Sequence, residues 1–191
     1  KNRLDETNKK DNARHSEHFN FLADCLTKKG NDVEGIIKKL SDFQVAIPSW
    51  ALGAGGTRFG RFGFQGEPSN LEEKIDDIGI LHALTQTAGA ISLHIPWDVP
   101  EDYKAIKELA NSHDIIFDAV NSNTFQDQKD ATESYKFGSL SNTNKAVREQ
   151  AIEHNIEVIK IGDRLGSKSL TVWLADGSNF PGQSNFQTTL Q

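Results

Sequence analysis

The 191-residue sequence has one cysteine, no methionine and five prolines. Cys25 cannot form an internal disulfide, and no Asn-x-Ser/Thr sequon is present, so a disulfide-stapled secreted domain is disfavoured. We therefore expect a cytoplasmic protein. No apolar run approaches the roughly 18 residues that cross a bilayer, so no membrane partner is expected. Because the chain begins at Lys1 without any methionine, we expect its natural start to lie outside this sequence.

Positive charge is also in short supply. Lys and Arg number 21 against 27 Asp and Glu, which gives a net charge of −6. A globally basic nucleic-acid-binding protein is therefore disfavoured, and we expect no nucleic-acid partner. The hydrophobic fraction of 36% and charged fraction of 25% are typical of a folded chain rather than a disordered one. The length suits one domain or a part of a larger one.

The pattern of apolar side chains divides the chain into three parts. Residues 1–12 are polar and are expected to be a frayed lead. Residues 13–41 predict two helices, the second capped by Asn31 or Asp32. Residues 42–191 alternate β-forming runs with helical segments. The runs cover residues 43–49, 90–96, 114–121 and 169–175, and the helices follow a Ser69–Glu72 capping box or cover residues 100–111 and 142–165.

Four repeats of strand and helix indicate parallel βαβ units in an α/β fold. Two architectures fit this order equally well. One is an open doubly wound sheet, and the other is the first half of a (β/α)8 barrel. In both, functional side chains gather at the carboxyl ends of the strands, so a site is expected at that edge of the sheet.

Three large side chains are expected to meet at this edge. Alternation gives each strand an aliphatic face, suited to helices, and a mixed face that ends near Trp50, His94 or Trp173. We expect these three to line a concave site, in which His94 is either catalytic or structural. The two tryptophans suit the apolar face of a sugar ring, or they simply fill the core. Asp98 is expected to cap the next helix rather than to orient the His94 imidazole.

Other patterns carry less information. Asp118 is expected to be a buried carboxylate bonded to its neighbours. The loop from Gly53 to Gly66 matches neither a dinucleotide-binding fingerprint nor a P-loop. Its alternating Arg and Phe residues suit either stacking on nucleic acid or, as we favour, a lid or subunit contact. Amides and hydroxyls in residues 121–125 and 176–183 suit polyol recognition or ordinary loops. The histidines form no metal motif, and Cys25 has no catalytic partner in the sequence.

The strings VAIPSWALGAGGTRFGRF, SLHIPWD, DAVNSNTF, SYKFGSLS and TVWLADGSNFPGQSNF follow one another between about Phe43 and Gln191. Together they resemble the L-rhamnose isomerase/sugar isomerase family of xylose isomerase-like TIM barrels. The resemblance implies the first four βα units of such a (β/α)8 barrel, preceded by the N-terminal helices. The barrel domain would then begin near residue 42 and be incomplete at residue 191.

The same resemblance implies an aldose–ketose isomerase that depends on a divalent metal, commonly manganese. Its substrate would be a rare or deoxy sugar such as L-rhamnose, and the intact protein would be a homo-oligomer, a tetramer. His94 matches a histidine that contacts the ring-oxygen end of the sugar and assists ring opening. Trp50, Phe125 and Trp173 match aromatic residues of the substrate pocket. Phe59 matches a residue that reaches into the neighbouring subunit's site.

The family's metal ligands, base carboxylates and catalytic lysine come from later strands, which this sequence does not contain. We therefore interpret the chain as the amino-terminal half of a sugar isomerase, inactive by itself and without metal ligands of its own. The alternative is a non-catalytic sugar-binding or assembly half-barrel that needs a partner chain. A nuclease of the same barrel superfamily is disfavoured by the net charge and the absent ligand clusters. These residues do not decide which sugar is preferred.

Overall fold

The computed structural model describes residues 2–53, 56–57, 60–61, 65–128, 130–174, 176, 185 and 187. Its helices are α1 (Asn2–Lys28), α2 (Val33–Ser41), α3 (Leu71–Thr85), α4 (Tyr103–Ser112) and α5 (Lys145–Leu165), with short 3-10 helices η1 (Ser49–Ala51) and η2 (Tyr135–Phe137). Its strands are β1 (Ala46–Pro48), β2 (Gly56–Thr57), β3 (Gly60–Arg61), β4 (Ala90–Ile95), β5 (Ile116–Thr124) and β6 (Ser169–Leu174).

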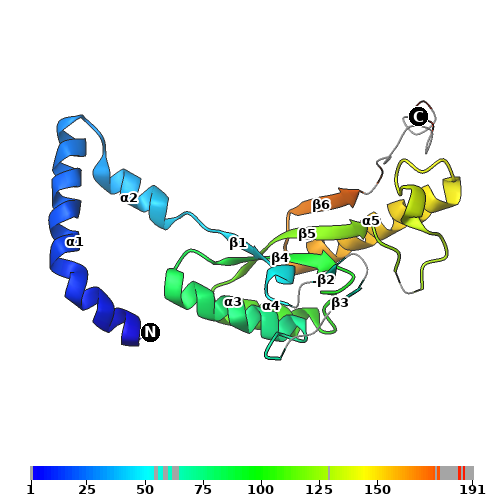
Figure 1. Ribbon diagram of the computed structural model, residues 1–191, viewed down its shortest axis with the longest axis horizontal. Helices are drawn as coiled ribbons and strands as arrows, with labels where there is room; N and C mark the ends of the chain where they lie inside the picture. Colours follow the sequence, from blue (N-terminus) through cyan, green and yellow to red (C-terminus); the bar gives the residue numbers. More distant parts are fainter. Residues whose placement is uncertain are drawn as a thin grey trace.

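Four of the strands form one parallel sheet in the order β1-β4-β5-β6 (Figure 1). The spatial order of these strands is also their order in the chain. A helix lies between each consecutive pair, because a parallel connection has to return along the full length of the sheet. The predicted βαβ alternation is therefore confirmed. β2 and β3 pair with each other in a separate antiparallel ribbon.

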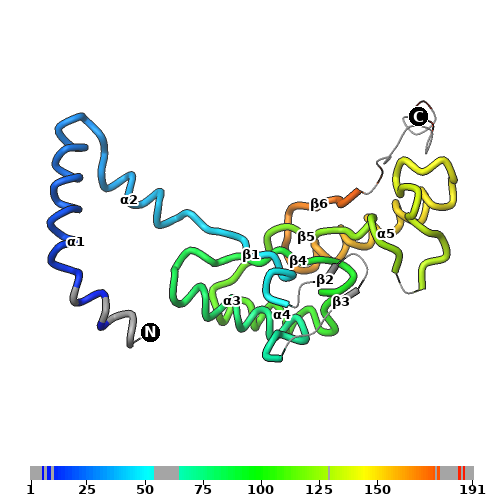
Figure 2. Tube along the Cα trace, in the orientation of Figure 1, coloured from blue at the N-terminus to red at the C-terminus, as the bar shows by residue number. Residues whose placement is uncertain are grey.

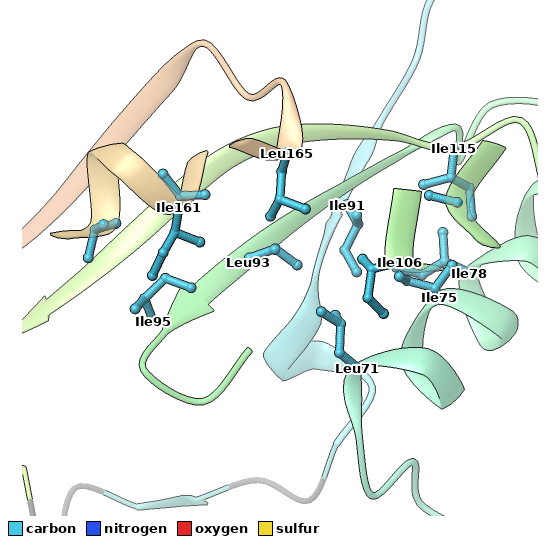
Figure 3. Close-up of a cluster of buried hydrophobic side chains, with 13 residues drawn as sticks. Leu71, Ile75, Ile78, Ile91, Leu93, Ile95, Ile106, Ile115, Ile161 and Leu165 are labelled. Atoms are coloured by element: carbon cyan, nitrogen blue, oxygen red, sulfur yellow. The ribbon is translucent and has the colours of Figure 1, made fainter. Parts of the chain in front are cut away.

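Helices α3, α4 and α5 cover the aliphatic face of the sheet and build the main core with it (Figure 3). Ile91, Leu93 and Ile95 of β4 are almost completely buried against these helices. The helical contribution comes from Leu71, Ile75, Ile78, Ile106, Ala110, Val158, Ile161 and Leu165. Right-handed crossovers that all advance in one direction leave their helices on one face, and the described strands show no reversal of order. This arrangement is compatible with part of a (β/α) barrel.

Helices α1 and α2 pack against each other and lie apart from the sheet (Figures 1 and 2). α1 begins at Asn2 rather than Ala13, so from Asn2 onward the expected polar lead lies within the helix. The Lys, Glu and Arg residues in this polar stretch are good helix formers, so the stretch is helical although it lacks an apolar stripe. α2 is capped by Asp32, one of the two residues expected to do so. The Asp32 side chain accepts a hydrogen bond from the Gly35 N–H. None of the described helices combines the length and apolarity needed to cross a membrane.

Two predicted helix caps are wrong by a few residues. The capping box of α3 is shifted by one position, because Asn70 accepts from the Glu73 N–H and the Glu73 carboxylate accepts from Ser69. α4 starts at Tyr103 and is capped by Asp102, whose side chain accepts from two backbone N–H groups of the first turn. Asp98, expected to be this cap, is buried elsewhere.

A β-bulge in β5 explains why the side-chain alternation of this strand was ambiguous in the sequence. Ile91 is opposite Phe117, but Leu93 is opposite Val120, so β5 holds one extra residue across from Ser92. The bulge turns Val120 to the helices, where it is 2% exposed. Asp118 lies within the bulge and is exposed, so its predicted burial is wrong. Its predicted bonding to a neighbour is confirmed, because it accepts from the Ser92 hydroxyl.

Candidate functional site

Five ring-bearing residues lie together at the carboxyl ends of the parallel strands. We call Trp50, His94, Trp97, Phe125 and Trp173 the aromatic cluster. Ring centroids are 5.3 Å apart for Trp50 and His94, 6.3 Å for Trp50 and Trp173, 4.7 Å for His94 and Trp97, 6.0 Å for His94 and Phe125, and 6.3 Å for Phe125 and Trp173. Each ring thus contacts at least one other, mostly edge to face, as aromatic quadrupoles favour.

Each element of the sheet contributes to the cluster. Trp50 lies in η1, directly after β1, and His94 is the penultimate residue of β4. Phe125 follows the last residue of β5, and Trp173 is the penultimate residue of β6. The structure therefore brings together all four described residues that the sequence predicted for a site. Parallel strands explain this result, because their carboxyl ends meet at one edge.

Trp97 is the member of the cluster that sequence reasoning missed. It lies in the turn after β4, and its ring is the nearest of the cluster to the His94 imidazole. The available signal was its place in the string SLHIPWD, three residues past His94 and beyond a strand end. Strand alternation does not extend into a turn, so that rule gave no reason to select it.

The tryptophans of the cluster remain accessible to a ligand. Trp50 is 37% exposed and Trp173 is 45% exposed, although both contact other rings. Large aromatic side chains that are packed on one side and open on the other present a flat apolar surface. Such a surface suits the C–H face of a sugar ring.

A hydrogen-bonded chain fixes the orientation of Trp173. Its indole Nε1–H donates to Asn121 Oδ1 over 3.0 Å, and the Asn121 amide donates to the Leu93 carbonyl over 2.9 Å. Asn121 is 4% exposed, so this amide is a buried link between β4, β5 and β6. Asn121 belongs to the amide-rich segment that the sequence indicated for polyol recognition. In the structure it holds an aromatic wall in place.

The neighbouring Asn123 is tied to helix α5. Its backbone N–H donates to His154 Nε2 over 3.1 Å, which requires an imidazole nitrogen without a proton. Burial lowers the pKa of His154 below its ordinary value of 6.5, and the nearby Glu157 carboxylate only partly opposes this. The neutral form that the contact requires is therefore also the form that burial favours.

Asp176 connects the end of β6 to the loop before α5. It accepts from the N–H groups of Ser139 and Ser141, each over 2.7 Å, and from the Ser139 hydroxyl over 2.8 Å. Burial raises the pKa of Asp176, but these hydrogen bonds together outweigh burial and bring the pKa below its ordinary value of 3.8. This carboxylate holds the loop and is not placed in the aromatic cluster.

Two further predictions concern Phe59 and a bound metal ion. Phe59, expected at a lid or at a neighbouring subunit's site, lies outside the described residues. In the described part of the chain, no three or more His, Cys, Asp or Glu side chains lie close enough to hold a metal ion. Among the described residues beside the aromatic cluster, the His94 imidazole and the Asn121 amide do not make up the carboxylate-rich ligand set that manganese prefers.

Comparison with known proteins points in one direction. No protein-family profile matches the chain. Over 168 residues the chain is 52% identical to a probable sugar isomerase of Rhizobium meliloti (strain 1021), which covers 88% of this chain and 39% of that protein. Over 165 residues it is 52% identical to a probable sugar isomerase of Mesorhizobium japonicum, which covers 86% of this chain and 38% of that protein.

The chain therefore spans about two fifths of the length of these curated relatives. The similarity covers most of the chain at an identity that leaves no doubt about homology. Both relatives are named as probable sugar isomerases, and neither name singles out L-rhamnose isomerase.

Proposed function

We propose that the chain carries the sugar-binding side of an aldose–ketose sugar isomerase. The observation that carries the proposal is the aromatic cluster, because it joins half-exposed rings and one histidine at the edge where parallel α/β folds bind ligands. The names of the two relatives, both probable sugar isomerases, support the same reaction class.

In this proposal the residues of the cluster have different roles. Trp50, Phe125 and Trp173 stack against the apolar face of the sugar and exclude water from it. His94 lies among these rings and exchanges a proton with the ring-oxygen end of the sugar, which assists ring opening. Asn121 holds the Trp173 indole, so that this wall is already in place before the sugar binds.

The finer parts of the proposal come from the family resemblance. We propose L-rhamnose or a related deoxy sugar as substrate, a (β/α)8 barrel as the complete fold, and a homo-oligomer in which Phe59 reaches a neighbouring site. A divalent metal such as manganese would polarise the sugar oxygens when bound. The described residues do not offer its ligand set. We therefore assign those ligands to sequence that the relatives have beyond the matched two fifths of their length.

Binding can be tested on the chain itself by isothermal titration calorimetry with L-rhamnose. Removing one stacked wall with Trp173→Ala should cost about 1–2 kcal/mol, or about tenfold in Kd. The matched control is Phe21→Ala, since Phe21 is 72% exposed on α1, apart from the sheet. Single-stranded DNA should not bind. Equal affinity of Trp173→Ala and the unchanged chain would contradict the placement of the sugar on this cluster.

Turnover separates the isomerase from the alternative of a non-catalytic sugar-binding or assembly half-barrel. We expect no aldose–ketose conversion by the 191 residues alone, even with manganese added. We expect conversion by a polypeptide that also contains a region equivalent to the rest of the relatives. Manganese-dependent turnover by the short chain would overturn the assignment of the metal ligands. Sugar binding without turnover by the long polypeptide would favour the alternative.

A further inference from the structure

A buried carboxylate is bonded to two of the segments that carry the aromatic cluster. Asp98, in the turn after β4, is 1% exposed and accepts three hydrogen bonds from three different segments. The donors are the Ser49 hydroxyl over 2.5 Å, the His94 backbone N–H over 2.7 Å and the Lys74 Nζ over 2.6 Å. The two carboxylate oxygens are thus occupied by η1, β4 and α3.

Lys74 supplies the positive charge that balances the buried Asp98 carboxylate. The side chain of Lys74 is 10% exposed, so it brings a positive charge from α3 into the same buried region as the carboxylate. A buried charge is tolerated when it is paired and hydrogen-bonded, and both conditions hold here. The ion pair therefore fixes Asp98 in space, and the two other donors are aligned on an anchored acceptor.

These two donors belong to the segments that carry the first two rings of the cluster. Ser49 immediately precedes Trp50 within η1, and the second donor is the backbone of His94 itself. One carboxylate oxygen, Oδ2, accepts from both. The backbones that carry Trp50 and His94 are thereby held at a set separation, and their rings meet with centroids 5.3 Å apart.

We propose that Asp98, anchored by Lys74, is a positioning residue that sets the contact between Trp50 and His94 and thereby the affinity of the site for its sugar. The part about affinity rests on the proposed function. The part about the ring contact does not. Asp98 acts through the Ser49 hydroxyl and the His94 backbone, and it neither caps α4 nor serves as a catalytic base.

The contact between the rings of Trp50 and His94 can be measured without any sugar. The chain has three tryptophans, so the double variant Trp97→Phe/Trp173→Phe leaves Trp50 as the only indole. A protonated imidazole quenches an adjacent indole, so Trp50 fluorescence should be lower in acid, where the imidazole is protonated, than in the neutral state. His94→Gln in this background should abolish the fall and thereby identify the quencher.

In the same background, Ser49→Ala and Asp98→Asn should each reduce the amplitude of the pH-dependent quenching by about twofold or more, because quenching requires contact between the rings. Lys104→Met is the control for loss of an ion pair, since it removes the exposed pair of Lys104 with Glu108 on α4. It should leave the amplitude unchanged. Unchanged amplitude in both Ser49→Ala and Asp98→Asn would overturn the inference.

A purely structural role is separated from positioning by the double variant Lys74→Met/Asp98→Asn. Removing both charges leaves no unpaired buried ion, so the thermal stability lost in Asp98→Asn should be largely regained. The quenching amplitude should stay low, because the anchored acceptor is still missing. Recovery of the full amplitude together with stability would show that Asp98 only stabilises the fold and would contradict the proposal. Ser49→Ala, which keeps the ion pair, covers the case in which the charge variants do not fold.

Sugar binding then tests the second part. In the chain with all three tryptophans, Ser49→Ala should raise the Kd for L-rhamnose by up to about tenfold, as loss of one hydrogen bond worth about 1 kcal/mol allows. If the unchanged chain binds no sugar, the proposed function fails while the quenching result still stands. If the sugar binds equally well to Ser49→Ala with reduced quenching, the link from the ring contact to affinity is wrong.

Discussion

Single side chains decide how the aromatic cluster is held. Trp173 is oriented by Asn121, and the end of β5 is tied to α5 by the contact between the Asn123 N–H and His154. Asn121 and Asn123 are themselves buried, so the loss of a partner leaves a buried polar group with little access to water. The accessible rings are therefore held by residues of β5 that are not themselves accessible.

The protonation of His154 gives the fold a pH dependence. Burial lowers the pKa of His154 in the folded chain, so as the pH falls below about 6.5 the unfolded chain takes up this proton first. The stability that this group contributes is complete above the unfolded value and is lost as the pH falls through the lower folded value. We expect the free energy of unfolding to decline over this range, and His154→Gln to flatten the decline.

Urea unfolding at a series of pH values between about 7 and about 5 measures this effect. The matched control is His15→Gln, which changes an exposed histidine of α1. A slope in His154→Gln as steep as that of the unchanged chain would contradict the role given to His154.

The sequence predicted most of the ring-bearing residues but not what supports them. Strand alternation indicated Trp50, His94 and Trp173, which lie at or near strand ends. Phe125 was indicated by the family strings alone. Asp98 was predicted to be a helix cap, because an acidic residue a few positions before a helix has that local pattern. Its true partners, Ser49 and Lys74, are remote in sequence, and no local rule connects them.

Among the secondary-structure elements, α5 packs against β5 at a glycine. A Cβ on Gly162 would lie 2.8 Å from Val120 Cγ2, a distance that requires one of the two elements to move. Val120 is 2% exposed and β-branched, so its side chain has little freedom to turn aside. The absence of a side chain at Gly162 therefore allows the packing of helix on sheet.

Overpacking usually costs about 1–3 kcal/mol, and the gain in helix propensity of about 1 kcal/mol offsets part of this cost. Because Val120 has little freedom to move, we expect the upper part of that range, and Gly162→Ala should destabilise the chain by about 1–2 kcal/mol net. The midpoint of urea unfolding measures the change. Gly53→Ala is the control, since a Cβ there would meet nothing within 4 Å. Equal midpoints for the two variants would refute the packing argument.

The order of the elements was predictable, while their boundaries were less so. Alternating patterns gave every parallel strand and the helices between them, because hydrophobic periodicity extends over many residues. The caps of α3 and α4 were displaced because several capping residues occur in succession at each start. Asn70 and Asp102 act as the caps since their side chains reach N–H groups of the first turn.

At the scale of the whole molecule, many large apolar side chains of the described residues are exposed. At one edge of the sheet, β6 has no strand beyond it among the described residues, and Val172, Trp173 and Leu174 are each more than a third exposed. An open strand edge that carries apolar side chains readily pairs with another chain. In a homologue more than twice as long, sequence beyond the matched region is available to cover such a surface.

We therefore expect the isolated chain to self-associate as its concentration rises, and Leu174→Lys to reduce this association by placing a charge beside the open edge. Sedimentation velocity over a range of concentrations measures the effect. Phe21→Lys is the control for added charge, since Phe21 lies on α1, remote from the edge. Identical association in Leu174→Lys and the unchanged chain would place the contact elsewhere on the molecule.

The extra residue of β5 has a consequence for how this chain tolerates insertion and deletion. Up to the bulge, Phe117 faces the helices, and beyond it Val120 does so while Asn121 faces the rings. Removing one residue at Asp118 or Ala119 would take out the extra residue and restore an unbroken two-residue period, with Val120 still toward the helices and Asn121 still toward the rings. Pairing the same residues without the bulge would instead turn Val120 toward Trp173 and place the Asn121 amide in the hydrocarbon interior. We therefore expect this strand to tolerate the loss of one residue at the bulge, but not the loss of the bulge at unchanged length.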